Sequence, residues 1–128
     1  MTYVDGFVFP IPKKNLASYR KMAEIGKKTW LKHGALQYFE CIGEDLNPPT
    51  PEGMESMKGI AFPKLVKARA GETVGFSFIM FKSRAHRDAV NKKVMKDPYM
   101  NDPKNMPKKM PFDPKRMSYG GFKVVVER

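Results

Sequence analysis

The sequence predicts an α+β domain of ferredoxin-like type, in which a four-stranded antiparallel sheet carries two helices on one face. Its length of 128 residues suits one domain, so we expect residues 1–128 to form a single unit. Along the chain, the spacing of hydrophobic residues is typical of a strand in some stretches and of a helix in others. These stretches follow in the order βαββαβ, which is the split βαβ arrangement of this fold. One predicted strand is also apolar on both faces, and such a strand needs cover on both.

An alternating strand opens the chain. Residues 3–11 alternate in character and are rich in β-favouring side chains, which predicts a strand. Asp5 shares one face of it with Tyr3, Phe7, Phe9 and Ile11. We expect Pro10 and Pro12 to end the strand and to open a helix.

A helix and a second strand follow. Over residues 14–33, spacings of three and four predict a helix whose inward face carries Leu16, Tyr19, Ala23, Gly26, Trp30 and His33. Gly34 stands where a C-terminal cap belongs. Residues 36–43 alternate again and predict a strand. Glu40 falls on the face of Leu36, Tyr38 and Ile42. Burial of that face would raise the pKa of Glu40 and make it a general acid–base candidate. At the edge of the sheet it would instead be an ordinary solvated carboxylate.

The second half of the chain repeats the strand and helix pattern. Residues 73–82 predict the strand that is apolar on both faces. Ser83 can cap a second helix over about residues 84–96, and the last strand is expected over residues 118–127.

Two irregular insertions interrupt this pattern, at about 47–63 and 97–117. The first has four prolines and two glycines, and the second has five of the eleven prolines together with four methionines. A long segment without regular structure is commonly functional or mobile. Residues 63–70 fit either one or two helical turns or a short edge strand.

Because both predicted helices cover one face of the sheet, the aromatic side chains of the other face need a second cover. We expect a homodimer formed through this open sheet face to supply it.

Charge and cysteine content limit the partners and the compartment. The net charge is +11, and residues 82–116 hold 11 basic against 4 acidic side chains. Such a field attracts a small anionic ligand, although a solvated surface explains it equally well. Cys41 is the only cysteine, and neither a signal peptide nor a membrane span is recognisable, so we expect a cytoplasmic protein. Nucleic acid is not the expected partner, because dimerisation occupies the sheet face that would bind it.

Three residues are the candidates for catalysis: His86, Glu40 and Asp88. His86 falls in the first turn of the second helix, where the helix dipole favours the neutral imidazole. A packed histidine bonded to a nearby carbonyl is the alternative, and an ordinary surface ion-pair ladder explains Asp88 equally well.

Further residues are candidates for ligand binding. They are Arg87, Asn91, Asp113, Arg116, Tyr119, Trp30 and His33. Trp30 and His33 end the inward face of the first helix and suit a packing role better. Asp113 and Arg116 either close over a pocket or pin a loop. The spacing of two histidines and one cysteine forms no metal motif, and we assign no cofactor.

Five short runs also point to one family. They are YVDGF from Tyr3, HGAL from His33, SRAHRDAVN from Ser83, MPFD from Met110 and RMSYGGF from Arg116. These runs resemble the YbaA-like family of unknown function, and the resemblance covers nearly the whole chain. It implies a dimeric α+β barrel, a superfamily that includes cofactor-independent monooxygenases, dismutase-like haem enzymes and stress-response proteins.

Three functions remain open. The first is a homodimeric small-molecule-binding domain, or a cofactor-independent enzyme, that acts on an anionic or aromatic metabolite in a pocket gated by residues 97–117. The second is a non-catalytic structural or regulatory dimer. RNA binding ranks third, because no recognisable RNA-binding motif accompanies the basic charge.

Overall fold

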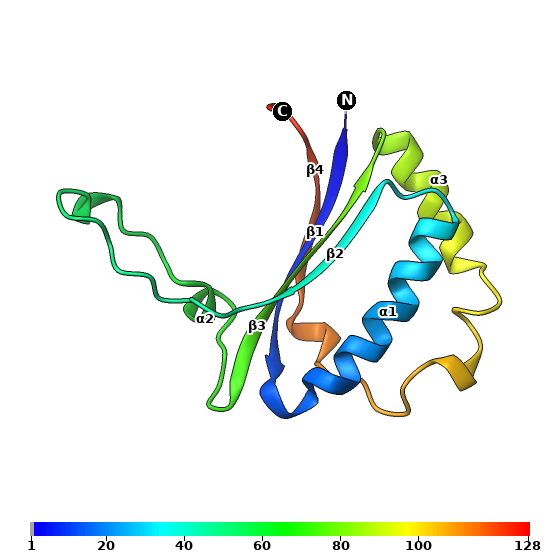
Figure 1. The fold of residues 1–128 in the computed structure, drawn as a ribbon, viewed down its shortest axis with the longest axis horizontal. Coiled ribbons are helices and arrows are strands. Elements are labelled where there is room, and N and C mark those ends of the chain that lie inside the picture. The colour runs from blue at the N-terminus through cyan, green and yellow to red at the C-terminus, as the bar shows by residue number, and fades with distance from the viewer. Residues whose placement is uncertain (1) are drawn as a thin grey trace.

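The computed structural model describes residues 2–128 and has the predicted ferredoxin-like architecture. One antiparallel sheet has the strand order β2-β3-β1-β4. Its strands are β1 (Tyr3–Pro12), β2 (Gln37–Ile42), β3 (Glu72–Phe81) and β4 (Ser118–Lys123). The two long helices, α1 (Leu16–Lys32) and α3 (Arg84–Met95), cover the same face of the sheet (Figure 1).

Two strand ends differ from the sequence prediction, and one undecided segment is resolved. β1 continues through Pro10 to Pro12, paired with β3, because β4 pairs with β1 only as far as Val8 and leaves the proline nitrogens no neighbour to bond. β4 ends at Lys123 rather than at residue 127, since Lys123 pairs with the first residue of β1. The undecided segment 63–70 begins with a single helical turn, α2 (Phe62–Leu65).

The insertion between β2 and β3 projects away from the body. In Figure 1 it extends from the sheet on the side opposite α1 and α3. It contains one short 3-10 turn, Glu55–Met57, and ends in α2. Phe62 of α2 packs edge-on against Phe76 of β3, with ring centroids 6.4 Å apart. The insertion therefore touches the sheet face that the two long helices leave open.

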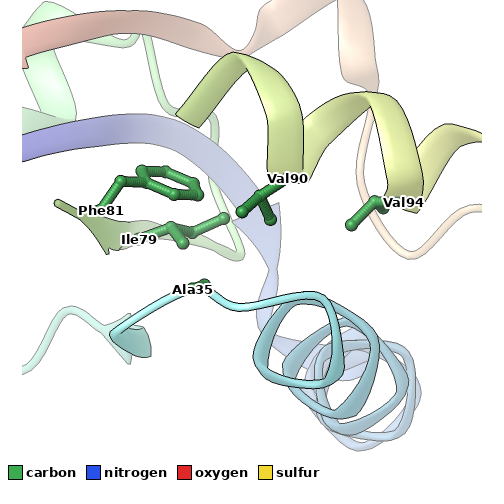
Figure 2. Packing of buried hydrophobic residues seen from close by; sticks show 5 residues of the cluster. All are labelled: Ala35, Ile79, Phe81, Val90 and Val94. Atoms are coloured by element: carbon green, nitrogen blue, oxygen red, sulfur yellow. The ribbon is translucent and has the colours of Figure 1, made fainter. Parts of the chain in front are cut away.

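A first core cluster joins α3 to the C-terminal end of β3. Figure 2 shows Val90 and Val94 of α3 beside Ile79 and Phe81 of β3, with Ala35 from the turn after α1. Each of these side chains is less than a tenth exposed. Burying one valine or phenylalanine contributes about 2 kcal/mol, so this cluster fixes α3 on the sheet.

A second cluster lies at the opposite end of the helix-facing surface. Phe9 and Ile11 of β1 pack with Tyr19 of α1 and with Phe112 from the long insertion before β4. The Phe9 and Phe112 ring centroids are 4.5 Å apart. This cluster fixes the start of α1 on the sheet.

Between the two clusters the helix-facing surface of the sheet is polar. The register places Glu40 beside Ser77 and Ser77 beside Phe7, in one row across β2, β3 and β1. Asp5 lies in the next row, opposite Ile79. Asp5 and Ser77 are 6% and 5% exposed. The hydrophobic core is thus split in two, and its middle has a polar floor.

The insertion of residues 97–117, here called the Pro/Met segment, is fastened to both ends of α1. At its start the Asp97 carboxylate accepts hydrogen bonds from His33 (2.7 Å), from Lys32 (3.2 Å) and from the backbone N–H groups of Tyr99 and Met100. Near its end, Nδ2 of Asn15 donates to the carbonyl of Pro111 (2.9 Å).

Arg116 supplies a further anchor at the end of the Pro/Met segment. Its Nη1 and Nη2 donate to the two carboxylate oxygens of Glu72 at 2.7 and 2.9 Å, and Nη2 also donates to the Lys67 carbonyl at 3.0 Å. The bidentate bond holds the pKa of Glu72 down at about 2. The sequence left open whether Arg116 closes over a pocket or pins a loop, and these bonds show that it pins the loop.

Replacing Arg116 by methionine keeps the unbranched apolar part of the side chain and removes all three hydrogen bonds. We expect the free energy of unfolding to fall by about 1–3 kcal/mol at pH 7 in urea denaturation. Because Glu72 must be ionised to accept the pair, the difference from wild type is present above pH 4.5 and disappears as the pH falls toward 2. Lys27→Met breaks the exposed Lys27–Glu24 pair and should change stability little; an equal loss in both variants would contradict the anchor.

Candidate functional site

A cavity of about 540 Å³ lies over the polar floor, between the sheet, the two long helices and the Pro/Met segment. Its lining comes from all four of these parts. The residues are Asp5, Phe7, Phe9, Tyr19, Met22, Ala23, Gly26, Trp30, Tyr38, Glu40, Ser77, Ile79, Arg87, Asn91, Met95, Met100, Met106, Met110, Phe112, Met117, Tyr119, Gly120 and Gly121. Polar side chains gather at two places in it, which we call the Glu40 pole and the Asp5 pole.

The Glu40 pole consists of one carboxyl group and two tyrosine hydroxyls. The hydroxyl of Tyr19 on α1 donates to Oε2 of Glu40, and the hydroxyl of Tyr38 donates to Oε1 at 2.7 Å. Burial raises the pKa of Glu40 to about 7 and also raises the pKa of Tyr38. The carboxyl group is therefore oriented by two donors and is able to gain or lose a proton near neutral pH.

The Asp5 pole is a hydrogen-bonded network across β1, α3 and α1. Nη1 of Arg87 donates to Asp5 at 2.7 Å, and Nδ2 of Asn91 lies 3.5 Å from the other carboxylate oxygen. Nε1 of Trp30 donates to Oδ1 of Asn91 at 3.0 Å. Burial raises the pKa of Asp5, while the Arg87 guanidinium opposes that rise. The guanidinium also lies 5.0 Å from the Tyr3 ring centroid, which holds it in place.

The rest of the lining is apolar and consists mainly of methionine and aromatic side chains. Four methionines of the Pro/Met segment, at positions 100, 106, 110 and 117, face the cavity with Phe112. Methionine side chains are flexible and polarisable, so they adapt to ligands of different shape. Tyr119 is 79% exposed and lies at the mouth, where its ring stacks on Phe7 with centroids 6.4 Å apart.

Five of the candidate residues from the sequence line this cavity. They are Glu40, Arg87, Asn91, Trp30 and Tyr119. β2 is an edge strand of the sheet, which is the position expected to leave Glu40 ordinary, and Leu36 and Ile42 on the same face are exposed. Glu40 itself is half-buried beneath α1, and this burial raises its pKa. Trp30 also has a packing role, because it contacts the first core cluster.

The other candidates lie outside the cavity and make local contacts. Nδ1 of His86 accepts from the backbone N–H of Lys82 (3.0 Å), and Ser83 caps α3 by accepting from the His86 N–H. Asp88 is exposed and pairs with Arg87 at 2.8 Å. His33, Asp113 and Arg116 also lie outside. His33 and Arg116 anchor the Pro/Met segment, while Asp113 caps its last 3-10 turn, Pro114–Arg116.

Sequence reasoning missed Asp5, Tyr19, Tyr38 and Ser77 as site residues. Asp5 gave a usable signal, because one carboxylate among four apolar side chains on a strand face must find a partner. Tyr19 and Tyr38 gave no such signal, since an aromatic residue on an inward face is usually part of the hydrophobic core.

Residues 2–128 contain no group of three or more His, Cys, Asp or Glu side chains arranged to hold a metal ion. In the same residues no helix is both long enough and apolar enough to cross a bilayer.

Comparison with known proteins gives the same family over nearly the whole chain. The model of a family described as "Protein of unknown function (DUF1428)" matches residues 2–114. The uncharacterized protein YbaA of Escherichia coli (strain K12) is 41% identical over 127 residues, which is 99% of both chains. The uncharacterized protein YbaA of Shigella flexneri is similar to the same extent.

Glu40 should make stability depend on pH between about 4.5 and 7. The unfolded carboxyl ionises near 4.5 and the folded one only near 7, so the folded state binds more protons in this window and the free energy of unfolding falls as pH rises. We expect the free energy of unfolding of wild type, measured by urea denaturation, to be lower at pH 7.5 than at pH 5. In Glu40→Gln this difference between the two pH values should be smaller by about 1–3 kcal/mol. Glu44→Gln, an exposed carboxyl just after β2, is the control. Identical slopes in wild type and Glu40→Gln would refute the assignment.

Proposed function

Because this chain belongs to the DUF1428 family, which is described as being of unknown function, we propose from the cavity itself that the protein binds a small apolar, ring-containing molecule. The observation that supports this proposal is the cavity of about 540 Å³, which is within the usual range for small-molecule sites. A non-catalytic structural dimer has no need of such a space.

The lining favours an aromatic ligand over an anionic one. Its two carboxyl groups, Asp5 and Glu40, would repel an anion, and Arg87 already pairs with Asp5. The methionine and aromatic side chains offer flat and adaptable apolar contacts. We therefore place the ring system between the two poles and its polar atoms at the poles.

Filling the cavity should weaken binding without unfolding the protein. Ala23 on α1 lines the cavity and is half-buried, so Ala23→Phe places a ring inside it. In ligand-observed NMR against a panel of flat aromatic carbonyl compounds, wild type should bind members of the panel, and Ala23→Phe should bind them at least about tenfold more weakly.

Ala17→Phe is the matched control, because Ala17 is an exposed position of the same helix. It should bind as wild type does. Equal binding by Ala23→Phe and wild type, or no binding by wild type across the panel, would contradict the proposal.

We further propose that the protein is a homodimer paired through the open sheet face. Phe39, Phe76 and Phe122 on this face are 44%, 43% and 60% exposed. The helix-distal strand positions carry no charged side chain between Val74 and Met80, although 29% of the chain is charged. An uncharged apolar face matches a second copy of itself, because a two-fold axis brings identical patches together.

A charge on this face should separate the dimer. We expect wild type to sediment as a dimer and Phe76→Glu as a monomer in analytical ultracentrifugation, since a carboxylate would be buried without a partner. Leu31→Glu, on the 42% exposed Leu31 of α1, should remain dimeric. A monomeric wild type would refute the interface, as would a dimeric Phe76→Glu.

We keep the cytoplasm as the proposed compartment. The thiol of Cys41 is exposed and free, which suits a reducing environment. Recovery of the protein in an oxidising compartment during cell fractionation would overturn this.

A further inference from the structure

We propose that Glu40 is the general acid–base of the cavity and that it moves a carbon-bound proton of a flat, apolar carbonyl compound. This inference rests on the proposed ligand cavity and adds a reaction class and a catalytic residue to it. Four features of the structure support it.

The first feature is the orientation of the carboxyl group. Glu40 stands on the sheet beside Ser77, and both of its oxygens accept a tyrosine hydroxyl. α1 makes room for the Tyr38 hydroxyl by having no side chain at Gly26, where a Cβ would lie 2.5 Å from the Tyr38 oxygen. The strand, the helix and the missing side chain together fix where the carboxyl oxygens point.

The second feature is the proton affinity of the group in its surroundings. A general base works best when its pKa is near the working pH, and burial brings the pKa of Glu40 to about 7. The titratable groups that face it are the hydroxyls of Tyr19 and Tyr38, and across the cavity the Asp5–Arg87 pair. On the outer side α1 contributes Arg20, Glu24 and Lys27. Glu24 and Lys27 pair with each other at 2.7 Å, so their charges largely offset.

The third feature is a path for the proton. A groove of about 490 Å³ between α1 and β2 shares Tyr19, Ala23, Tyr38 and Glu40 with the cavity. Its outer rim carries the exposed, charged Arg20 and Glu24. Glu40 thus lies between the ligand space and a groove that has the exposed Arg20 and Glu24 in its lining. It can exchange its proton with solvent while a ligand occupies the cavity.

The fourth feature is a set of donors at the other pole. Arg87 bonds Asp5 through Nη1 and Asp88 through Nε, which leaves Nη2 for a ligand oxygen. Although the charge of Arg87 is offset by these two carboxylates, a fixed N–H donor in a largely apolar cavity stabilises the negative charge that develops on a carbonyl oxygen as a carbon conjugated with it loses its proton.

The reaction balances without a further reagent. The substrate carries a C=C bond conjugated with its carbonyl group. The Glu40 carboxylate removes a proton from the carbon at the end of this conjugated system remote from the oxygen, and the C–H electron pair shifts along it to form an extended enolate whose oxygen receives a hydrogen bond at the Asp5 pole. The Glu40 carboxylic acid then returns a proton to a conjugated carbon of the same molecule. The product is an isomer of the substrate, and the carboxylate is regenerated.

The test uses 5-nitrobenzisoxazole, a flat aromatic compound that fits the proposed ligand class. A base removes its ring C–H proton, the C–H electron pair completes a nitrile, and the N–O bond breaks to release a coloured phenolate. We expect wild type to accelerate this reaction over buffer, with a rate that rises with pH and levels above about 7. Glu40→Gln should be about 10²-fold slower, while Glu44→Gln should match wild type.

Binding of the probe is measured separately by ligand-observed NMR. If Glu40→Gln binds the probe and reacts as fast as wild type, the acid–base role is overturned and the ligand cavity stands. If wild type binds members of the aromatic panel but does not accelerate the reaction of the probe, the acid–base proposal is overturned and the ligand cavity stands; if it binds neither the probe nor any member of the panel, both proposals are contradicted. If Ala23→Phe reacts at the wild-type rate, the reaction takes place outside the cavity and the acid–base proposal is again overturned.

Tyr38→Phe distinguishes a positioning role from a structural one. Loss of a donor to the carboxylate should raise the pKa of Glu40, so the midpoint of the pH–rate profile should move to higher pH. Tyr99→Phe, at a 49% exposed tyrosine of the Pro/Met segment, should leave the midpoint in place. An unchanged midpoint in Tyr38→Phe would exclude the tyrosine from positioning Glu40.

Discussion

The structure depends on a hydrophobic core that is interrupted in its middle. One cluster around Phe81 and Val90 fixes α3 at one end of the sheet, and another around Phe9 and Ile11 fixes α1 at the other. The row between them carries Ser77 and Glu40 where a continuous core would carry apolar side chains. Because protein interiors are close-packed, a space of this size persists only if the surrounding elements are held from both sides. The two clusters do this, and they leave the helices unable to collapse onto the polar row.

The Pro/Met segment completes the enclosure without regular secondary structure. Its prolines disfavour both a helix and a strand, so the segment holds its course through side-chain anchors instead. Asp97 fastens it to the C-terminal end of α1, and Arg116 fastens it to Glu72 at the start of β3. Between these anchors Met100, Met106 and Met110 line the cavity, and Met117 lines it directly after Arg116. A segment anchored at its ends and flexible in its side chains can enclose ligands that differ in shape.

Much of the architecture follows from local pattern, and part of the site does too. The alternation over residues 36–43 placed Glu40 on the correct strand face, and the spacing along the first helix placed Tyr19 and Trp30 on the inward one. His86 shows where local reasoning is limited. Its position in a charged helix start suggested chemistry, whereas its ring nitrogen is bonded to the backbone of Lys82. Sequence cannot separate these outcomes, because a capping contact and a catalytic contact use the same side chain.

The sequence by itself determined the order of the elements and the two irregular insertions, since period and proline content are local properties. Only the tertiary structure decided which inward side chains are core and which are site. In the sequence pattern Tyr19 and Tyr38 are both inward-facing positions like those of core residues. In the structure both hydroxyls bond Glu40, because α1 crosses β2 at that point and Gly26 lets the Tyr38 hydroxyl approach. Which side chains meet depends on the rotation and height of a helix over a sheet, and those are set by the packing clusters at its two ends.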